Sequence, residues 1–166
     1  MIAMSLDLND INNLDKPAFV HKLGFVFEHS PWVADAAWYH RPFSSLTELH
    51  QAMISAVEHA EWSKKLDLIE AHPDLAGKVH MTKESQKEQS SAGLDQLSEA
   101  ESKEFLELNK AYTEKFRIPF IVAVKENTKD EIKHALKERL MNNRETEINT
   151  ALQEIYKIAR YRLEDI

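Results

Sequence analysis

The chain of 166 residues contains no cysteine and only three glycines and five prolines. The lack of cysteine excludes a disulfide scaffold, thiol catalysis, iron–sulfur clusters and zinc sites with thiolate ligands. So few glycines and prolines do not suit a collagen-like, linker-rich or turn-dense all-β protein. No apolar run approaches the roughly 20 residues of a membrane-spanning helix. Residues 1–10 lack the basic start and apolar stretch of a signal peptide, so we expect a cytoplasmic protein.

The composition, with 43% hydrophobic and 30% charged residues, is ordinary for a globular protein. A polypeptide of this length fits one domain and can bury roughly 70% of its unfolded surface, so we expect a single domain over residues 1–166. The net charge of −7 does not attract phosphate backbones, and the short basic clusters at 139–144 and 157–162 lie among acidic residues. We therefore expect no nucleic-acid partner and no membrane partner.

Helical periodicity runs through most of the sequence. Asp15 is a suitable N-cap for a helix with Pro17 in its first turn, and Ser45 or Thr47 is suitable for a later one. Capping boxes, in which a hydroxyl and a carboxylate satisfy each other's backbone N–H groups, occur at 98–101 and at 128–131. Further apolar positions at helical spacing indicate helices in 32–39, in 62–72 and after Asn142-Asn143, where the longest one begins.

One run of the sequence is typical of a strand. Phe120–Val124 is apolar, continuous and rich in β-branched residues. Because the sequence offers no second strand to pair with it, we expect a buried extended segment at about residues 119–124. The sequence thus predicts an all-α, single-domain helical bundle with one extended segment inside it.

A histidine at a helix end is the first candidate for chemistry. His72 comes directly before Pro73, which ends the preceding helix because the residue before a proline is disfavoured in the α conformation. The partial negative charge at a helix C-terminus favours the imidazolium form, which suits proton transfer near neutral pH. The alternative is a histidine that only caps the last carbonyl groups of the helix.

A short polar helix is the second candidate. Thr82 is a suitable N-cap for it, and Gly93 is a suitable left-handed residue after its end. Ser85, Glu88 and Gln89 are spaced i, i+3 and i+4, so their side chains share one face. A hydroxyl, a carboxylate and an amide on one face can bind a polar heterocycle. A solvated amphipathic surface is an equal alternative.

The sequence indicates no metal site. None of the eight histidines forms the i, i+4 pair of a His-Glu-x-x-His helix. A glycine-rich phosphate loop, a Gly-x-Ser-x-Gly turn and a dinucleotide-binding fingerprint are also missing. We therefore expect neither a metal nor an organic cofactor.

The order and spacing of these motifs resemble the OHCU decarboxylase family (OHCU is 2-oxo-4-hydroxy-4-carboxy-5-ureidoimidazoline). The resemblance runs from 25–32 through Arg41-Pro42-Phe43 to 157–163. Its most specific parts are His-Pro-Asp-Leu-Ala-Gly at 72–77 and Glu-Ser-x-x-Glu-Gln-x-x-Ala-Gly-Leu at 84–94. It implies an all-α homodimer and a carboxy-lyase that, without a cofactor, decarboxylates OHCU to (S)-allantoin, the third step of urate degradation in purine catabolism.

The resemblance also implies which residues form the site. Carried over by position, it makes His72, Glu88 and Arg162 catalytic. The sequence differs from many members at Arg117-Ile118, where Gly-Phe is common, and in a shorter segment at 78–81. The implied substrate-binding positions are Pro73, Ser85, Gln86, Lys87, Glu88 and Gln89, and the backbone of Phe120, Ile121, Val122, Ala123 and Val124.

The implied substrate has a hydroxyl and a carboxylate on one ring carbon, beside a C=N bond. The electron pair left by CO2 can enter this imine, so the substrate is its own electron sink and requires no pyridoxal, thiamine or metal. In this hypothesis His72 transfers the protons, Glu88 orients the imidazole, and Arg162 binds the carboxylate or a ring oxygen through charge-assisted hydrogen bonds.

Two non-catalytic alternatives stay open. His-Pro-Asp also marks the J-domain of chaperone partners, so the protein is alternatively a helical interaction module that uses this loop. Such a module needs a basic helix before the motif, whereas Lys64-Lys65 is followed here by Asp67 and Glu70. The protein also exceeds the roughly 70 residues such a module needs. The other alternative is a family member that kept the fold, lost its activity and serves as a dimerising partner.

Overall fold

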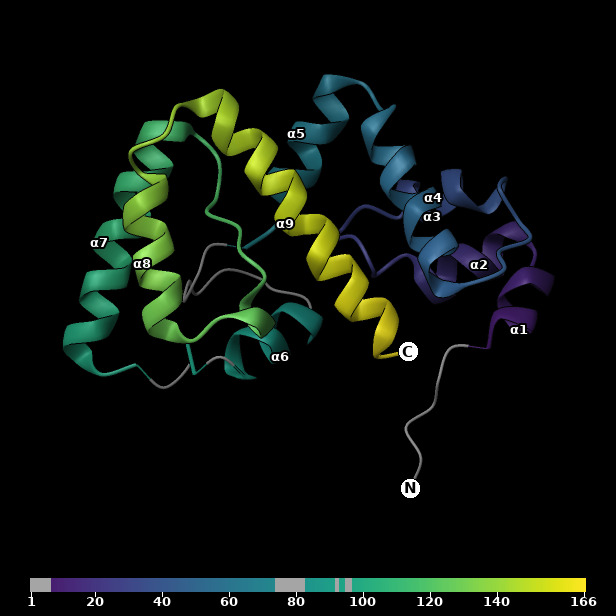
Figure 1. The fold of residues 1–166 in the computed structure, drawn as a ribbon, viewed down its shortest axis with the longest axis horizontal. Coiled ribbons are helices and arrows are strands. Elements are labelled where there is room, and N and C mark those ends of the chain that lie inside the picture. Colours follow the sequence, from purple (N-terminus) through teal and green to yellow (C-terminus); the bar gives the residue numbers. More distant parts are fainter. Residues whose placement is uncertain (1–6, 74–82, 92, 95–96) are drawn as a thin grey trace. The chain divides into compact units, whose positions relative to one another are not determined.

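The computed structural model of the protein describes residues 7–73, 83–91, 93–94 and 97–166. Within these ranges the regular structure consists of nine α-helices and one short 3-10 helix, with no strand, so the all-α prediction is confirmed (Figure 1). The protein divides into two compact units. The first unit comprises residues up to 71 together with 156–166, and the second comprises 72–155. A single domain over residues 1–166 stays a prediction.

Side-chain caps fix where helices of the first unit begin. Asp15 accepts a hydrogen bond from the Ala18 N–H, and Ser45 accepts one from the Glu48 N–H, as predicted. The third helix packs against the second and the fourth. The helices of this unit are α1 (Leu8–Asn13), α2 (Lys16–Leu23), α3 (Trp32–Trp38), α4 (Leu46–Glu58) and α5 (Trp62–Ala71), joined by the end of α9 (Arg144–Glu164).

Two features of the first unit are not indicated by the apolar pattern. Helix α1 precedes the first predicted helix, and Asp7 caps it by accepting hydrogen bonds from the N–H groups of Asn9 and Asp10. The apolar spacing also predicts that the helix begun at Asp15 continues to a break at Ser30-Pro31, but α2 ends at Leu23. The residue that follows is Gly24, and glycine is a poor helix former, which explains the earlier end.

The second unit contains α6 (Lys83–Ser91), α7 (Glu99–Phe116), η1 (Val124–Glu126), α8 (Lys129–Arg139) and most of α9. Both predicted capping boxes are confirmed: Ser98 with Glu101 begins α7, and Thr128 with Glu131 begins α8. Helices α7 and α8 lie side by side (Figure 1). The predicted N-cap Thr82 lies outside the described residues. Gly93 has the predicted left-handed conformation, with φ of 79°.

The predicted extended segment is confirmed over residues 119–123. These residues have no helix or strand assignment, and Phe120, Ile121, Val122 and Ala123 are all buried. Val124 is buried too, but it begins η1. The Phe120 ring packs edge-on against Tyr112 of α7, with 5.1 Å between the ring centroids. Tyr112 therefore packs α7 against the extended segment.

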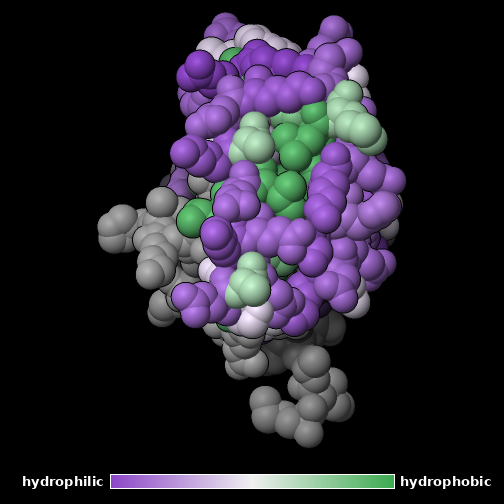
Figure 2. All heavy atoms as spheres, turned by 90° about the vertical axis from the view of Figure 1, so that its left-hand side faces the viewer, coloured by the Kyte–Doolittle hydropathy of each residue, from purple (hydrophilic) through white to green (hydrophobic). Residues whose placement is uncertain are grey.

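The outer face of the second unit on the side of α7 is mostly hydrophilic, with one apolar patch between hydrophilic side chains (Figure 2). In the described part of this unit, the exposed large apolar side chains are Leu106 and Met141. No described helix combines the length and the apolar character that crossing a membrane requires.

Candidate active site

The first candidate residue lies directly after a helix. His72 follows the last residue of α5, and only 7% of its surface is exposed. The last carbonyl groups of a helix have no partner within the helix and carry partial negative charge. Pro73 is half-buried beside His72, and the rest of the motif, 74–77, lies outside the described residues.

Helix α6 has one side turned towards the protein. Gln89 is buried, Glu88 is half-buried and Lys87 is exposed. The side chain of Gln89 is therefore not part of a solvated surface. Ser85 and Gln86 lie in the first half of the same helix. Helix α6 also packs against η1, so the two elements expected to bind substrate, α6 and the extended segment with Val124, are neighbours in the second unit.

The backbone of the extended segment is anchored by side chains. The C=O of Ile121 accepts a hydrogen bond from Nη1 of Arg139 at 2.6 Å. The N–H of Ala123 donates to Oε1 of Glu154 at 3.1 Å, and the C=O of Ala123 accepts from Nδ2 of Asn127 at 2.9 Å. Side chains from α8, from α9 and from the loop after η1 thus fix this segment.

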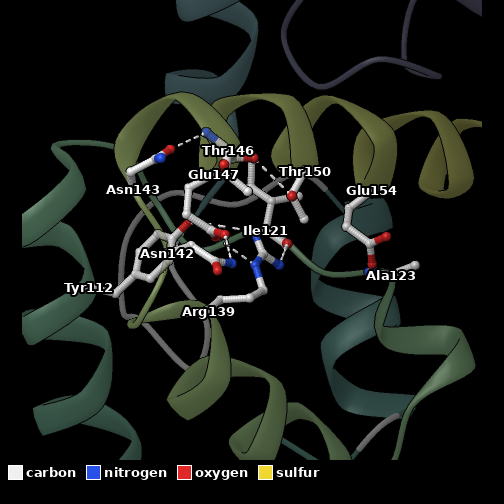
Figure 3. A network of polar contacts seen from close by, with 10 residues as sticks. All are labelled: Tyr112, Ile121, Ala123, Arg139, Asn142, Asn143, Thr146, Glu147, Thr150 and Glu154. Atoms are coloured by element: carbon white, nitrogen blue, oxygen red, sulfur yellow. Dashed lines mark hydrogen bonds and ion pairs between the residues drawn. The ribbon is translucent and has the colours of Figure 1, made fainter.

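A buried polar network holds Arg139 in place (Figure 3). Glu147 is fully buried, and its Oε1 accepts hydrogen bonds from Nε of Arg139 and from the hydroxyl of Tyr112, both at 2.7 Å. Its Oε2 accepts from Nδ2 of Asn142 at 2.8 Å. Burial, and next the hydrogen bond to Glu147, raise the pKa of the Tyr112 hydroxyl, which therefore stays protonated as a donor.

Arg162 lies in the last turn of α9 and belongs to the first unit. Its side chain is 3% exposed, and its Nη1 donates to the C=O of Phe25 at 3.1 Å and to Oε1 of Glu28 at 3.3 Å. Glu28 is fully buried, and the hydroxyl of Ser30 donates to its backbone carbonyl oxygen at 2.9 Å. A buried ion pair holds its partners firmly, because separating them leaves an uncompensated charge.

The supporting residues Glu28, Arg139, Glu147 and Glu154 are absent from the sequence prediction. Part of the signal was available, since Glu147 and Glu154 are seven residues apart and lie on the apolar face of α9 with Ala151. Carboxylates at such positions are buried only when they are paired or hydrogen-bonded. Their partners, however, lie in other elements and cannot be named from periodicity.

The described residues define an all-helical protein with a buried histidine at a helix end, a polar helix and an anchored backbone segment. This set suits the binding of a small polar molecule and acid–base chemistry on it. Within the described ranges, no group of three or more His, Cys, Asp or Glu side chains is placed to hold a metal ion.

Comparison with known proteins shows to which family this all-helical protein belongs. The family described as OHCU decarboxylase matches residues 12–164. The 2-oxo-4-hydroxy-4-carboxy-5-ureidoimidazoline decarboxylase of Halalkalicoccus jeotgali is 46% identical over 161 residues, which cover 97% of this chain and 92% of the relative. The uric acid degradation bifunctional protein PucL of Bacillus subtilis is 47% identical over 159 residues, 96% of this chain and 32% of that protein.

A solved structure has the same fold. The structure described as (S)-allantoin synthase superposes with a TM-score of 0.78 and 30% identity, over 95% of this chain and 53% of that one. The chain belongs to the OHCU decarboxylase family.

Proposed function

We propose that this protein is a carboxy-lyase that decarboxylates OHCU to (S)-allantoin in urate degradation. The observation that carries this conclusion is the family match over residues 12–164, which includes His72 and the polar helix α6. A relative of nearly the same length, 46% identical, has the OHCU decarboxylase name. The substrate is then a small anionic heterocycle with a ureido arm.

The proton steps of this reaction suit an imidazole. The bond to the carboxylate breaks, and its electron pair forms a double bond to the neighbouring ring carbon while the imine nitrogen takes up a proton. The hydroxyl then loses its proton and becomes a carbonyl, and the neighbouring carbon gains a proton on one face. We assign to His72 the removal of the hydroxyl proton and the delivery of a proton to that carbon. Acid–base catalysis of this kind contributes about 10²–10⁴-fold.

The other residues orient the groups that react. Glu88 orients the imidazole of His72 and balances its positive charge. For Arg162 we propose the contact with the carboxylate or a ring oxygen, and this assignment rests on the family resemblance alone. The remaining proposed contacts, with the ring, its carbonyl groups and the ureido arm, belong to Pro73, Ser85, Gln86, Lys87, Gln89 and the backbone of 120–124.

The experiment that tests this function adds the purified protein to freshly generated OHCU and follows optical rotation. We expect rapid formation of one allantoin enantiomer, against a slow and racemic background decay. Prior dialysis against EDTA should leave the rate unchanged, because the substrate supplies its own electron sink. A rate equal to the background would refute the enzyme and favour the helical interaction module.

Replacement of the proposed acid–base residue is the first mutational prediction. His72→Asn should lower kcat by about 10²-fold or more, because asparagine cannot exchange protons near neutral pH. The circular dichroism spectrum should retain its helical signal. His21→Asn, at an exposed position of α2, is the matched control and should keep full activity. Full activity in His72→Asn would contradict the assignment.

A further inference from the structure

We propose that Glu154 and Arg139 are positioning residues for the reaction. They hold the backbone of residues 121–123 from one side, so that Val122 presents its N–H and C=O to the substrate on the other. This inference rests on the proposed substrate-binding role of 120–124. Neither residue is expected to exchange protons with the substrate.

The two hydrogen bonds are formed on the same side of the segment. In an extended segment, the backbone groups of residues i and i+2 point the same way, and those of the residue between them point the opposite way. The C=O of Ile121 is bonded to Arg139 at the end of α8, and the N–H of Ala123 is bonded to Glu154 in α9 (Figure 3). The backbone of Val122 therefore points away from these two side chains.

Both anchoring groups are charged and nearly buried. Arg139 and Glu154 are each 9% exposed, and hydrogen bonds to ionised groups are shorter and stronger than neutral ones. Arg139 is held in turn by Glu147, with 2.7 Å between its Nε and Oε1 of the carboxylate. The guanidinium carbon of Arg139 lies 4.4 Å from the centroid of the Phe120 ring. The backbone of residues 121–123 is thus fixed by the side chains of Arg139 and Glu154, which are both largely shielded from solvent.

Val122 lies between the two anchored residues. It is 7% exposed, and within the described ranges its N–H and C=O form no hydrogen bond. Burying both groups unpaired is costly. A ligand group that carries an acceptor beside a donor, such as the carbonyl and N–H of a ureido arm, satisfies both at once. The support from Glu154 and Arg139 therefore acts on substrate affinity more than on the chemical step.

The experiment compares two replacements of Glu154 by their kcat and KM for OHCU. Glu154→Leu removes the acceptor of the Ala123 N–H and should raise KM about tenfold while kcat changes less than about threefold. Glu154→Gln retains an oxygen acceptor and should stay within about threefold of the wild-type KM. Glu145→Leu is the control, because it makes the same change at an exposed position of α9, away from the segment; it should leave KM unchanged.

Several outcomes would overturn the inference: an unchanged KM in Glu154→Leu, an equal loss in both Glu154 variants, or a fall in kcat alone. A wild-type protein without activity on OHCU would instead refute the proposed function. A second measurement needs no variant. On addition of (S)-allantoin to ¹⁵N-labelled wild-type protein, the amide signal of Val122 should shift more than that of Ala123. The reverse order would also overturn the inference.

Discussion

A buried guanidinium has few ways to change its hydrogen bonds. Nη1 of Arg162 is shared between the backbone carbonyl of Phe25 and the carboxylate of Glu28. Both partners lie in the turn region after α2, more than 130 positions away in the sequence, at separations of 137 and 134. These two bonds restrict the orientation of the planar group, and the proposed contact with a carboxylate or a ring oxygen would require such a fixed orientation.

Arg162→Lys should lower kcat/KM by on the order of 10²-fold, because an ammonium supplies a point charge where a planar fork is needed. The measurement is the optical-rotation assay, with urea unfolding to record the change in stability. Arg160→Lys is the matched control on the same helix, where the arginine is partly exposed and bonded to Glu164 and Thr47. We expect it to be nearly neutral. Equal activities of the two variants would contradict the role of Arg162.

The residues of the site differ in how well the sequence predicts them. Local rules single out His72 and Gln89 as candidates, since one follows a helix stopped by proline and the other lies four residues after Ser85 on the same helical face. The anchoring residues Arg139 and Glu154 escape such rules because their hydrogen bonds to the segment span 18 and 31 residues. A charge on an apolar face signals a buried partner, but only the folded protein identifies that partner.

At the scale of single elements, the helix ends follow local chemistry most closely. The capping boxes of α7 and α8 are predicted from four residues each and are confirmed. Both α6 and α7 are followed by a left-handed residue, Gly93 with φ of 79° and Arg117 with φ of 60°. The N–H of Arg117 donates to the C=O of Thr113, as in a helix C-cap. The turn thus forms with arginine in the left-handed position.

These two positions give a paired prediction for stability. Arg117→Gly should raise the free energy of unfolding by about 1 kcal/mol, because the left-handed conformation is unfavourable for residues with a Cβ atom. Gly93→Ala should lower it by about 1 kcal/mol. A Cβ atom at Gly93 would meet nothing within 4 Å, so its cost would be conformational and not steric.

Urea unfolding at constant pH measures both changes. A loss of stability in Arg117→Gly would contradict the interpretation, and so would an unchanged stability in Gly93→Ala. The two variants are expected to change the free energy of unfolding in opposite directions. A general destabilisation by any substitution in the second unit would instead lower it in both.

For the whole molecule, the sequence predicts the fold class and the family better than it predicts the oligomeric state or the location. Helical periodicity predicts an all-α protein, and the order of the motifs resembles the OHCU decarboxylase family. The comparisons confirm the family over residues 12–164. The homodimer and the cytoplasmic location stay predictions. A dimer depends on surface complementarity, and a cellular location depends on targeting signals; the helical periodicity of the sequence reveals neither. The core is easier to predict, because the spacing of apolar residues shows which side of each helix is buried.

The response of folding to pH provides a test on the whole molecule. His50 of α4 is partly buried, and its Nε2 donates to the C=O of Tyr156 at 2.8 Å. Burial lowers the pKa of His50 below the usual 6.5, although the hydrogen bond to Tyr156 opposes this shift. The charge of Arg160 lowers the pKa further and that of Glu164 raises it. His50 in the folded protein thus takes up its proton at lower pH than in the unfolded protein.

Below pH 6.5 the unfolded state therefore binds more protons at His50 than the folded state, and stability falls as the pH falls through this range. His50→Gln retains an N–H donor for Tyr156 but does not titrate, so its free energy of unfolding should decline less than that of the wild type between pH 7 and about pH 5. Urea unfolding of both proteins at several pH values measures the difference. The wild type and His50→Gln share every other titrating group. If the free energy of unfolding declined equally in both proteins, His50 would titrate alike in the folded and unfolded states, and the prediction would be wrong.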